Sequence, residues 1–255
     1  MLATKPDYRE RLYGSYVQTH MARIRDITLD GVRRDFPILR KTVAPFLPTD
    51  KNAKILDIGC GFGSLVLFLR ENGCRNVEGI DNSPQMMEVA SRLGIDGVSK
   101  SDIFSYLEDV SGRYGMIVAL DVIEHFRKDE IFAILDLVHQ ALRAGGLFLM
   151  QTPNGMSKYG RWYRTYDFTH ETIFDAESAR QCLSAIGFRN VVIKPVPPVV
   201  HGMPSAVRAV LWRFWEPMLK LSFAVESGWQ PEQVFTPNLL ALAYKKAERG
   251  AASGR

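Results

Sequence analysis

A strand followed by three closely spaced glycines is the clearest sign of a ligand site in this sequence. Residues 55–63 read Ile-Leu-Asp-Ile-Gly-Cys-Gly-Phe-Gly. Glycine lets a backbone turn sharply and approach a ligand, and the N–H groups of the following helix face what is bound. The spacing differs from the G-x-G-x-x-G of dinucleotide sites, and Asp57 within the strand is also unlike them. We expect a flat or anionic ligand here rather than a simple turn. Its predicted contact residues are Asp57, Gly59, Cys60, Gly61 and Gly63.

Acidic residues follow the next two predicted strands. Asp81, with Asn82 beside it, lies about twenty positions after the glycines, where a carboxylate can accept hydrogen bonds from both ribose hydroxyls of an adenosine. Asp102 could accept from an adenine amino group while Ile103 packs on the ring. The alternative for both aspartates is that they only cap the following helices. Together with the glycines, they fit one adenosine-containing ligand.

Three residues that could act on a substrate end the fourth predicted strand: Asp121, Glu124 and His125. Ligands of parallel sheets bind at this end of the strands. His125 could act as a general base. If the segment turns helically, the spacing i, i+3, i+4 could also bring the three side chains onto one divalent metal ion. We do not favour a metal, and the alternative is that Asp121 supports a cofactor while the other two hold the loop.

Aromatic and charged side chains are mixed in the segment 161–171. Rings can stack on the apolar face of a sugar while charged groups pair with its hydroxyls, so the segment is a predicted acceptor site. His170 is our first choice of general base and His125 the second. The alternative is that Asp167 and Thr169 cap the next helix and His170 lies on the surface. The predicted acceptor-binding residues are Arg161, Tyr163, Arg164, Tyr166, Asp167 and His170.

Short apolar runs alternate with amphipathic helical stretches from residue 54 onward, which is typical of βαβ units and a parallel sheet. The predicted strands span 54–58, 76–80, 97–99 (weakly), 114–120, 146–151, 190–194 and 239–244. One predicted helix begins after the Ser83 cap, with Pro84 in its first turn. The other predicted helices span 64–72, 131–142 and 175–186.

The remaining segments surround this domain, which we place at residues 51–247. Residues 1–50 are predicted to form a helical cap or lid, and residues 248–255 a disordered tail. Residues 195–238 are an insertion too long for a plain connection. Within it, 206–223 has the period of an amphipathic helix, interrupted by Pro217. This helix is expected to pack over the substrate pocket or against a partner subunit in a homodimer, with a peripheral membrane contact as the alternative.

Composition narrows the classes of function only slightly. The net charge of +4 comes from dispersed residues, so we expect no specific nucleic-acid partner. The three cysteines form no C-x-x-C pair, which argues against a zinc or dithiol site built on them. No apolar run reaches the length of a membrane span, and the first ten residues are charged, so we expect a cytoplasmic protein, with the inner face of the membrane as one location.

Four of these segments together resemble the successive motifs of class I S-adenosylmethionine (SAM)-dependent methyltransferases: 55–63, 79–84, 101–104 and 120–126. The resemblance implies a Rossmann-like α/β fold with a seven-stranded sheet, mostly parallel with the last strand antiparallel, and helices on both faces. It also implies SAM as cofactor, with the three glycines under its methionine and ribose, Asp81 on the ribose, and Asp102 with Ile103 at the adenine. No Pro-Pro-Tyr or Pro-Pro-Phe segment follows the fourth strand, which disfavours methylation of nucleic-acid bases.

A looser resemblance concerns the acceptor. The Thr152-Pro153-Asn154 and 167–171 segments are similar to methyltransferases of bacterial surface-polysaccharide assembly. We therefore expect methylation of a sugar hydroxyl in a surface glycan or its activated or lipid-linked precursor. Two alternatives stay open: an O-methyltransferase for a small aromatic or quinone-precursor hydroxyl, and a non-catalytic SAM-binding protein that regulates or scaffolds an assembly.

Overall fold

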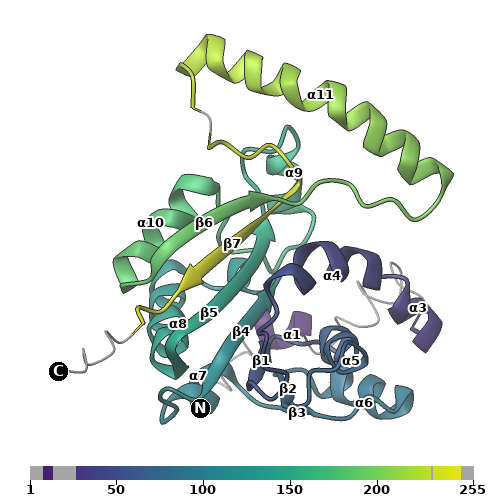
Figure 1. The fold of residues 1–255 in the computed structure, drawn as a ribbon, viewed down its shortest axis with the longest axis vertical. Coiled ribbons are helices and arrows are strands. Elements are labelled where there is room, and N and C mark those ends of the chain that lie inside the picture. Colours follow the sequence, from purple (N-terminus) through teal and green to yellow (C-terminus); the bar gives the residue numbers. More distant parts are fainter. Residues whose placement is uncertain (1–7, 14–26, 231, 248–255) are drawn as a thin grey trace, which may run out of the picture.

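A seven-stranded sheet crosses the computed structural model, which describes residues 8–13, 27–230 and 232–247 (Figure 1). The strand order is β3-β2-β1-β4-β5-β7-β6, and only β7 runs antiparallel to its neighbours. This confirms the predicted Rossmann-like sheet. The strands are β1 Ile55–Ile58, β2 Val77–Asp81, β3 Val98–Lys100, β4 Tyr114–Leu120, β5 Leu142–Pro153, β6 Arg189–Pro195 and β7 Asn238–Tyr244.

Helices cover both faces of the sheet. Strands β1 and β4 are buried on both sides, as continuous apolar runs in a parallel sheet require. One apolar cluster joins the sheet to α8 and α10, and a second joins its other face to α4, α5 and α6. The helices are α5 Ser64–Glu71, α6 Pro84–Leu93, α7 Ile103–Leu107, α8 Lys128–Ala141, α9 Gly160–Thr165 and α10 Ala176–Ile186, with the short 3-10 helix η3 Ile123–His125.

Side chains cap the starts of two helices, at Ser83 as predicted and at Asp175, which was predicted only to begin its helix. The Ser83 hydroxyl accepts the Met86 N–H at the start of α6, and Asp175 forms a capping box with Ser178 at the start of α10. Strand β5 is longer than predicted because Leu142 already pairs with Tyr114 before a register shift. These elements carry the loops at the carboxyl ends of β1, β2, β4 and β5 to one edge of the sheet.

The described part of the N-terminal segment packs on the domain. It comprises α1 Tyr8–Tyr13, α3 Leu29–Arg33, α4 Phe36–Thr42 and the 3-10 helix η2 Ala44–Phe46. Phe36 packs edge-on against Phe68 of α5, with ring centroids 5.1 Å apart. Arg9 pairs with Glu130 at 2.9 Å and with Glu171 at 3.3 Å, so α1 lies against the loop that follows α9. Residues 14–26 and the predicted tail 248–255 lie outside the described residues.

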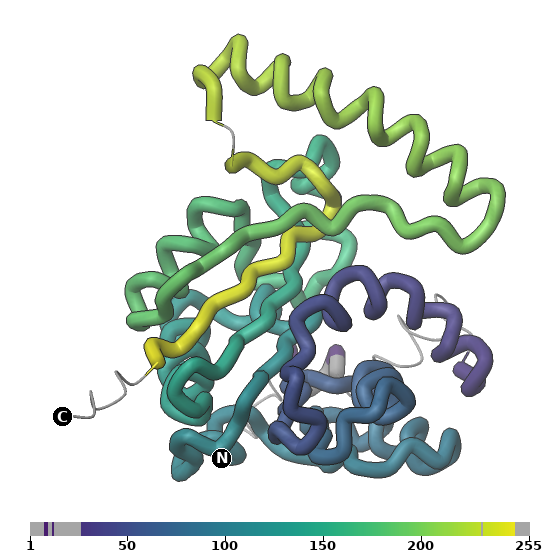
Figure 2. The backbone as a smooth tube through the Cα atoms, viewed as in Figure 1, coloured from purple at the N-terminus to yellow at the C-terminus, as the bar shows by residue number. Residues whose placement is uncertain are grey.

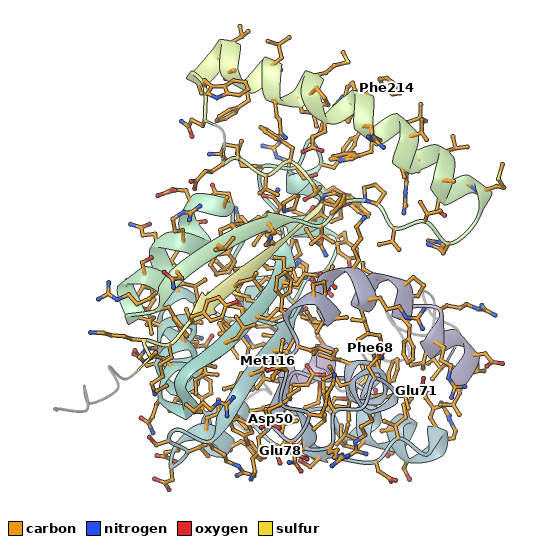
Figure 3. The ribbon with its side chains drawn as sticks, viewed as in Figure 1. Asp50, Phe68, Glu71, Glu78, Met116 and Phe214 are labelled. Atoms are coloured by element: carbon orange, nitrogen blue, oxygen red, sulfur yellow. The ribbon has the colours of Figure 1, made fainter. Side chains whose placement is uncertain are left out.

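The insertion forms one long helix, α11 Met203–Ser227, set apart from the sheet (Figures 1 and 2). It contains the predicted helical stretch 206–223 and runs through Pro217. Phe214 points away from the rest of the molecule and is 72% exposed (Figure 3). Ser205 is the one buried residue of α11, so most of the helix surface is exposed in the single chain, and its packing over the substrate pocket or against a partner subunit stays a prediction. No helix among the described residues is both long and apolar enough to cross a membrane.

Candidate functional site

The glycine loop lies between β1 and α5 and takes the backbone shape that its sequence predicts. Gly59, Gly61 and Gly63 all have positive φ, the left-handed region that favours glycine. A Cβ on Gly59 would lie 2.5 Å from a methyl group of Val122, whereas one on Gly61 would meet only the Met86 sulfur, at 3.9 Å. The loop therefore packs closely on the segment after β4, while the surface above Gly61 is open to a ligand.

Asp81 ties this loop to the end of β2. One oxygen of its carboxylate accepts the Gly61 N–H at 2.9 Å and the other accepts the Ser83 N–H at 2.8 Å. Burial raises the pKa of Asp81, and this effect is larger than that of the two hydrogen bonds, which lower the pKa. A carboxylate can accept about four hydrogen bonds, so both oxygens keep capacity for two ribose hydroxyls. The next residue, Asn82, is exposed in the turn before α6.

Asp102 stands at the end of β3, beside β2, because Asp81 pairs with Lys100 in the sheet. One oxygen of Asp102 accepts the N–H groups of Phe104 and Ser105, so it caps α7, as the alternative interpretation held. Ile103 is buried in the core cluster. The cap still leaves the second carboxylate oxygen for a ligand, and the adenine contact stays a prediction.

Two predicted contact residues lie beneath the loop. Burial, with the nearby charge of Asp81, raises the pKa of Asp57, which is enclosed in β1. The Cys60 side chain packs where a Cβ on Gly79 would stand, 2.9 Å from its sulfur. Cys60 is therefore a core residue whose backbone alone can face a ligand, and Gly79, which sequence reasoning passed over, makes room for it.

Asp121 turns the chain at the end of β4. It is one of two described non-glycine residues with positive φ, at 55°. Its carboxylate accepts hydrogen bonds from Gln151 at 3.1 Å and Asn238 at 3.4 Å, from the ends of β5 and β7. Neither amide was predicted as a partner of Asp121, because both residues are far from it in the sequence and only the fold brings the three strand ends together. Asp121 is thereby held in place beside the loop that carries Glu124 and His125.

The loop 121–126 is joined to the loop 167–172 through backbone hydrogen bonds. The Glu124 carbonyl accepts the N–H groups of Glu171 and Thr172, at 2.9 and 3.0 Å. This contact brings His125 and His170 together, with ring centroids 4.8 Å apart and an edge-on arrangement. The two residues predicted as alternative bases are therefore direct neighbours.

Hydrogen bonds hold each ring in place. The Thr169 hydroxyl donates its proton to Asp167 at 2.6 Å and lies 2.8 Å from His125 Nδ1, and the His125 ring also interacts with the backbone carbonyls of Thr169 and Asp121. His170 Nδ1 lies 2.8 Å from the Tyr163 carbonyl, which only accepts. In neutral His170, Nε2 is therefore the basic nitrogen. Burial, together with the neighbouring His170, lowers the pKa of His125 to about 4.

Thr169 is a residue that the sequence did not single out, and it connects Asp167 to His125. We expect Thr169→Val to lower the free energy of unfolding by about 1–3 kcal/mol, because it removes the hydroxyl partner of two buried polar groups. Urea unfolding measures this. Thr165→Val, whose hydroxyl bonds only to backbone carbonyls of α9, is the matched control. An equal, small loss in both variants would contradict the connecting role.

Helix α9 presents the predicted acceptor-binding side chains unevenly. Arg161, Arg164 and Tyr166 are exposed, Tyr163 is half-buried, and Asp167 is buried beneath them. Trp162 stacks on Tyr166 with centroids 4.9 Å apart, and Tyr166 meets His170 edge-on at 5.9 Å. A row of aromatic rings thus leads to the histidine pair. The carboxylate of Asp167 accepts hydrogen bonds from Thr169 rather than facing a ligand, and the sequence pattern alone could not show this.

The geometry bears on the metal triad of Asp121, Glu124 and His125, which we considered and did not favour. The 121–125 segment does turn, but helically only from Ile123, and the Asp121 carboxylate is held by Gln151 and Asn238. Among the described residues, the group whose possible ligand atoms lie within 4.8 Å of one another is Glu124, His125 and His170. His170 thus takes the place that we gave to Asp121.

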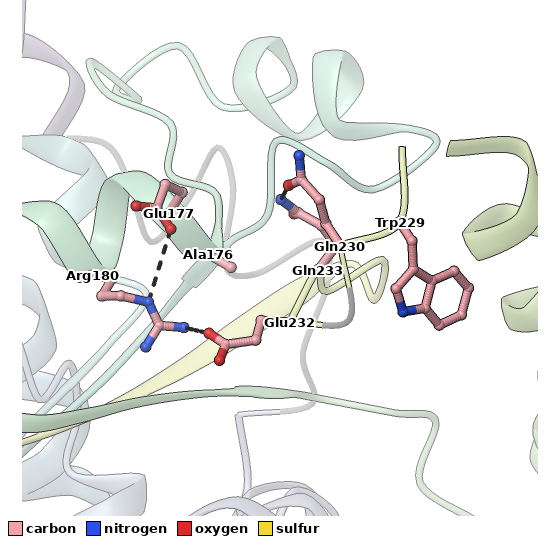
Figure 4. Close-up of a pocket in the computed structure, with 7 residues that line it drawn as sticks. All are labelled: Ala176, Glu177, Arg180, Trp229, Gln230, Glu232 and Gln233. Atoms are coloured by element: carbon pink, nitrogen blue, oxygen red, sulfur yellow. Dashed lines mark hydrogen bonds and ion pairs between the residues drawn. The ribbon is translucent and has the colours of Figure 1, made fainter. Parts of the chain in front are cut away.

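A separate hollow of about 300 Å³ lies between the start of α10 and the segment after α11 (Figure 4). Arg180 crosses it to pair with Glu232 and Glu177. It contains none of the residues of the glycine loop or the histidine pair, so we do not assign it to the site. Its lining residues are Ala176, Glu177, Arg180, Trp229, Gln230, Glu232 and Gln233.

Comparison with known families gives a match over most of the chain. A family model described as a methyltransferase domain matches residues 32–193. The crystal structure of a SAM-dependent methyltransferase from Archaeoglobus fulgidus is similar in fold, with a TM-score of 0.64 at 20% identity. The likeness covers 85% of this chain and 96% of that one.

Curated relatives match over parts of their lengths. Cyclopropane-fatty-acyl-phospholipid synthase of Escherichia coli (strain K12) is 26% identical over 115 residues, 44% of this chain and 29% of that protein. Sphingolipid C9-methyltransferase of Candida albicans is 26% identical over 214 residues, 75% of this chain and 40% of that protein. The chain thus spans less than half the length of these two relatives.

Proposed function

Because this chain belongs to the methyltransferase-domain family, we propose that it methylates a hydroxyl group of a sugar, in a surface glycan or in its activated or lipid-linked precursor. The chain is a SAM-dependent methyltransferase, and SAM is its cofactor. The observation that carries the proposal for the acceptor is the His125–His170 pair at the end of a row of aromatic rings.

The residues at the glycine loop fit SAM. The open surface above Gly61 and the remaining acceptor capacity of Asp81 suit a methionine and a ribose, and Asp102 lies beside them for the adenine. Val122 packs under Gly59, so the loop that carries His125 begins directly beside the cofactor site. Bound SAM supplies an electrophilic methyl group on its sulfonium.

The histidine pair is positioned to handle the proton of an alcohol. A hydroxyl must lose its proton as it attacks the methyl group, and a neutral imidazole nitrogen within hydrogen-bond reach can take it. The hydrogen bond to Tyr163 leaves His170 Nε2 as that nitrogen. His170 is less enclosed than Glu124 and borders Tyr166, so we propose it as the base, with His125 orienting it.

The exposed side chains of α9 suit a polar ring. Tyr166 and Trp162 offer stacked faces, while Arg161 and Arg164 offer guanidinium donors beside them. Aromatic faces and charged donors together match a pyranose or a nucleotide sugar better than they match a wholly apolar ring. This favours the glycan over a small aromatic acceptor.

Helix α11 supports a lipid-linked acceptor. Large apolar side chains on it are 54–81% exposed, and Lys158 beside α9 lies 4.6 Å from the Trp215 ring, so α11 borders the proposed acceptor site. Amphipathic helices with tryptophan and basic residues lie in membrane interfaces. Both curated relatives described above have a lipid in their names. The exposed residues are Met203, Val207, Val210, Leu211, Phe214, Met218, Leu221 and Val225.

We expect the double change Phe214→Glu and Leu221→Glu to weaken binding to phosphatidylglycerol vesicles at least tenfold, because it removes apolar area and adds negative charge. Cosedimentation measures the binding. Phe132→Glu alters an exposed aromatic of α8 and should leave it unchanged. Unchanged vesicle binding together with loss of a concentration-dependent dimer would assign α11 to a subunit interface instead.

The acceptor is tested by incubating the protein with methyl-labelled SAM and fractions of a bacterial extract. We expect label in saccharide or lipid-linked saccharide fractions, and none when His170→Ala replaces the wild-type protein. Label in a catechol or quinone-precursor fraction would assign the aromatic acceptor instead. Cofactor binding without any labelled product would leave the non-catalytic SAM-binding role.

A further inference from the structure

We propose that Glu124, His125 and His170 form a binding site for one divalent first-row transition-metal ion. The three residues come from η3 and from the loop after α9, and their ligand atoms lie within 4.8 Å of one another. Bonds of about 2.0–2.1 Å would set ligand atoms about 3.4 Å apart around one zinc ion, so side-chain shifts of about 1 Å close the site.

The burial of Glu124 is the first observation that points to a cation. Its side chain is 1% exposed, and neither carboxyl oxygen has a hydrogen bond of good geometry among the described residues, although the Thr152 hydroxyl is close enough to interact with it. A buried carboxylate without a well-formed partner is costly, and buried charges are normally paired or bound to a metal. The neighbouring carboxylates of Asp121 and Asp167 add further negative charge. A cation would supply the missing positive charge.

The histidines provide the second, independent observation. Metal-binding histidines usually donate their other ring N–H to a carbonyl, carboxylate or hydroxyl, which fixes the ring. His170 shows that arrangement, because its Nδ1 donates to the Tyr163 carbonyl and its Nε2 is the nitrogen that can bind a metal ion. The His125 ring is held by the Thr169 hydroxyl, which lies 2.8 Å from Nδ1 and is itself bound to Asp167.

The donor set selects the kind of ion. Two imidazole nitrogens and one carboxylate suit zinc, cobalt, nickel or iron, whereas magnesium prefers oxygen donors. Three protein ligands leave a coordination position open. Under the proposed function, on which this use of the site rests, an acceptor hydroxyl would take that position and lose its proton more easily, and His170 would then serve as a ligand rather than as the base.

The site is tested by titrating the full chain, freed of metal with a chelator and without a histidine tag, with zinc chloride in a calorimeter. We expect one zinc ion per chain, and binding at least tenfold weaker in Glu124→Gln and in His170→Ala. Cobalt chloride should give a visible absorption band that these variants lose, and magnesium chloride should give no binding. His201→Ala changes an exposed histidine outside the cluster and should bind zinc as the wild type does.

Circular dichroism and SAM affinity show whether each variant is folded. Absence of zinc binding by the folded wild-type protein would overturn the proposal, and so would equal affinity in the folded Glu124→Gln and His170→Ala variants. Failure to find a methylated acceptor leaves these titrations unaffected, so the metal site and the proposed function fail separately.

Discussion

Replacing His170 by alanine should slow methyl transfer by about a hundredfold or more while SAM binds as before. General acid–base groups contribute about 10²–10⁴-fold to rates, and a role as metal ligand would make the loss similar. SAM affinity should be unchanged because the contacts of His170 are with Tyr163, Tyr166 and His125, away from the glycine loop. The labelled saccharide fraction gives the rate, and calorimetry gives the affinity.

His139→Ala is the matched control for this experiment. That histidine lies in the last turn of α8 and packs edge-on against Phe188, and its loss should affect the stability of the protein more than the rate of transfer. A His170→Ala variant that keeps both its rate and its acceptor affinity would remove the base from our account. A variant that loses SAM affinity as well would place His170 in the cofactor site.

The second large effect concerns cofactor binding. Asp81→Ala should weaken SAM binding by about ten- to a hundredfold, because each hydrogen bond to a charged group contributes about 1.5–3 kcal/mol. The substitution also frees the Gly61 and Ser83 N–H groups that shape the loop. Gly61→Val should weaken SAM binding by a second route, since valine disfavours a φ of +55° and its side chain would occupy the open surface.

Calorimetric titration with SAM measures both variants. Asp109→Ala removes an exposed carboxylate near the opposite end of the sheet and should leave the affinity unchanged. If Asp81→Ala binds SAM with wild-type affinity while remaining folded, the ribose is bound elsewhere and the interpretation of the glycine loop is wrong.

The backbone shape of the predicted cofactor half of the site could be anticipated because it is local in the sequence. The strand, the glycines and the first turn of α5 are contiguous, and Asp81 ends the next strand along the sheet. Glycine positions carry a direct conformational signal, since positive φ excludes most other residues. The same holds for the helix caps at Ser83 and Asp175, which act within three residues of their partners.

The acceptor half could be predicted only in its parts. His125 and His170 were singled out separately, but their contact depends on hydrogen bonds to the backbone carbonyl of Glu124. Every residue has such a carbonyl, so the sequence carries no signal for this contact. The positive φ of Asp121, uncommon for any residue other than glycine, could not be read from the sequence, and neither could the hydrogen bonds from Gln151 and Asn238 that hold its carboxylate. The sequence predicted that α11 is a helix but not where it lies, because its period shows which side is apolar and not what covers that side.

The most direct test of the account is a crystal structure of the protein with S-adenosylhomocysteine. We predict that the ribose hydroxyls lie within hydrogen-bond distance of Asp81 and that the sulfur faces His125 and His170 from above the glycine loop. A ribose on Asp81 with the sulfur turned away from the histidine pair, or a ligand bound outside the glycine loop, would contradict the claim that this pair acts on the acceptor.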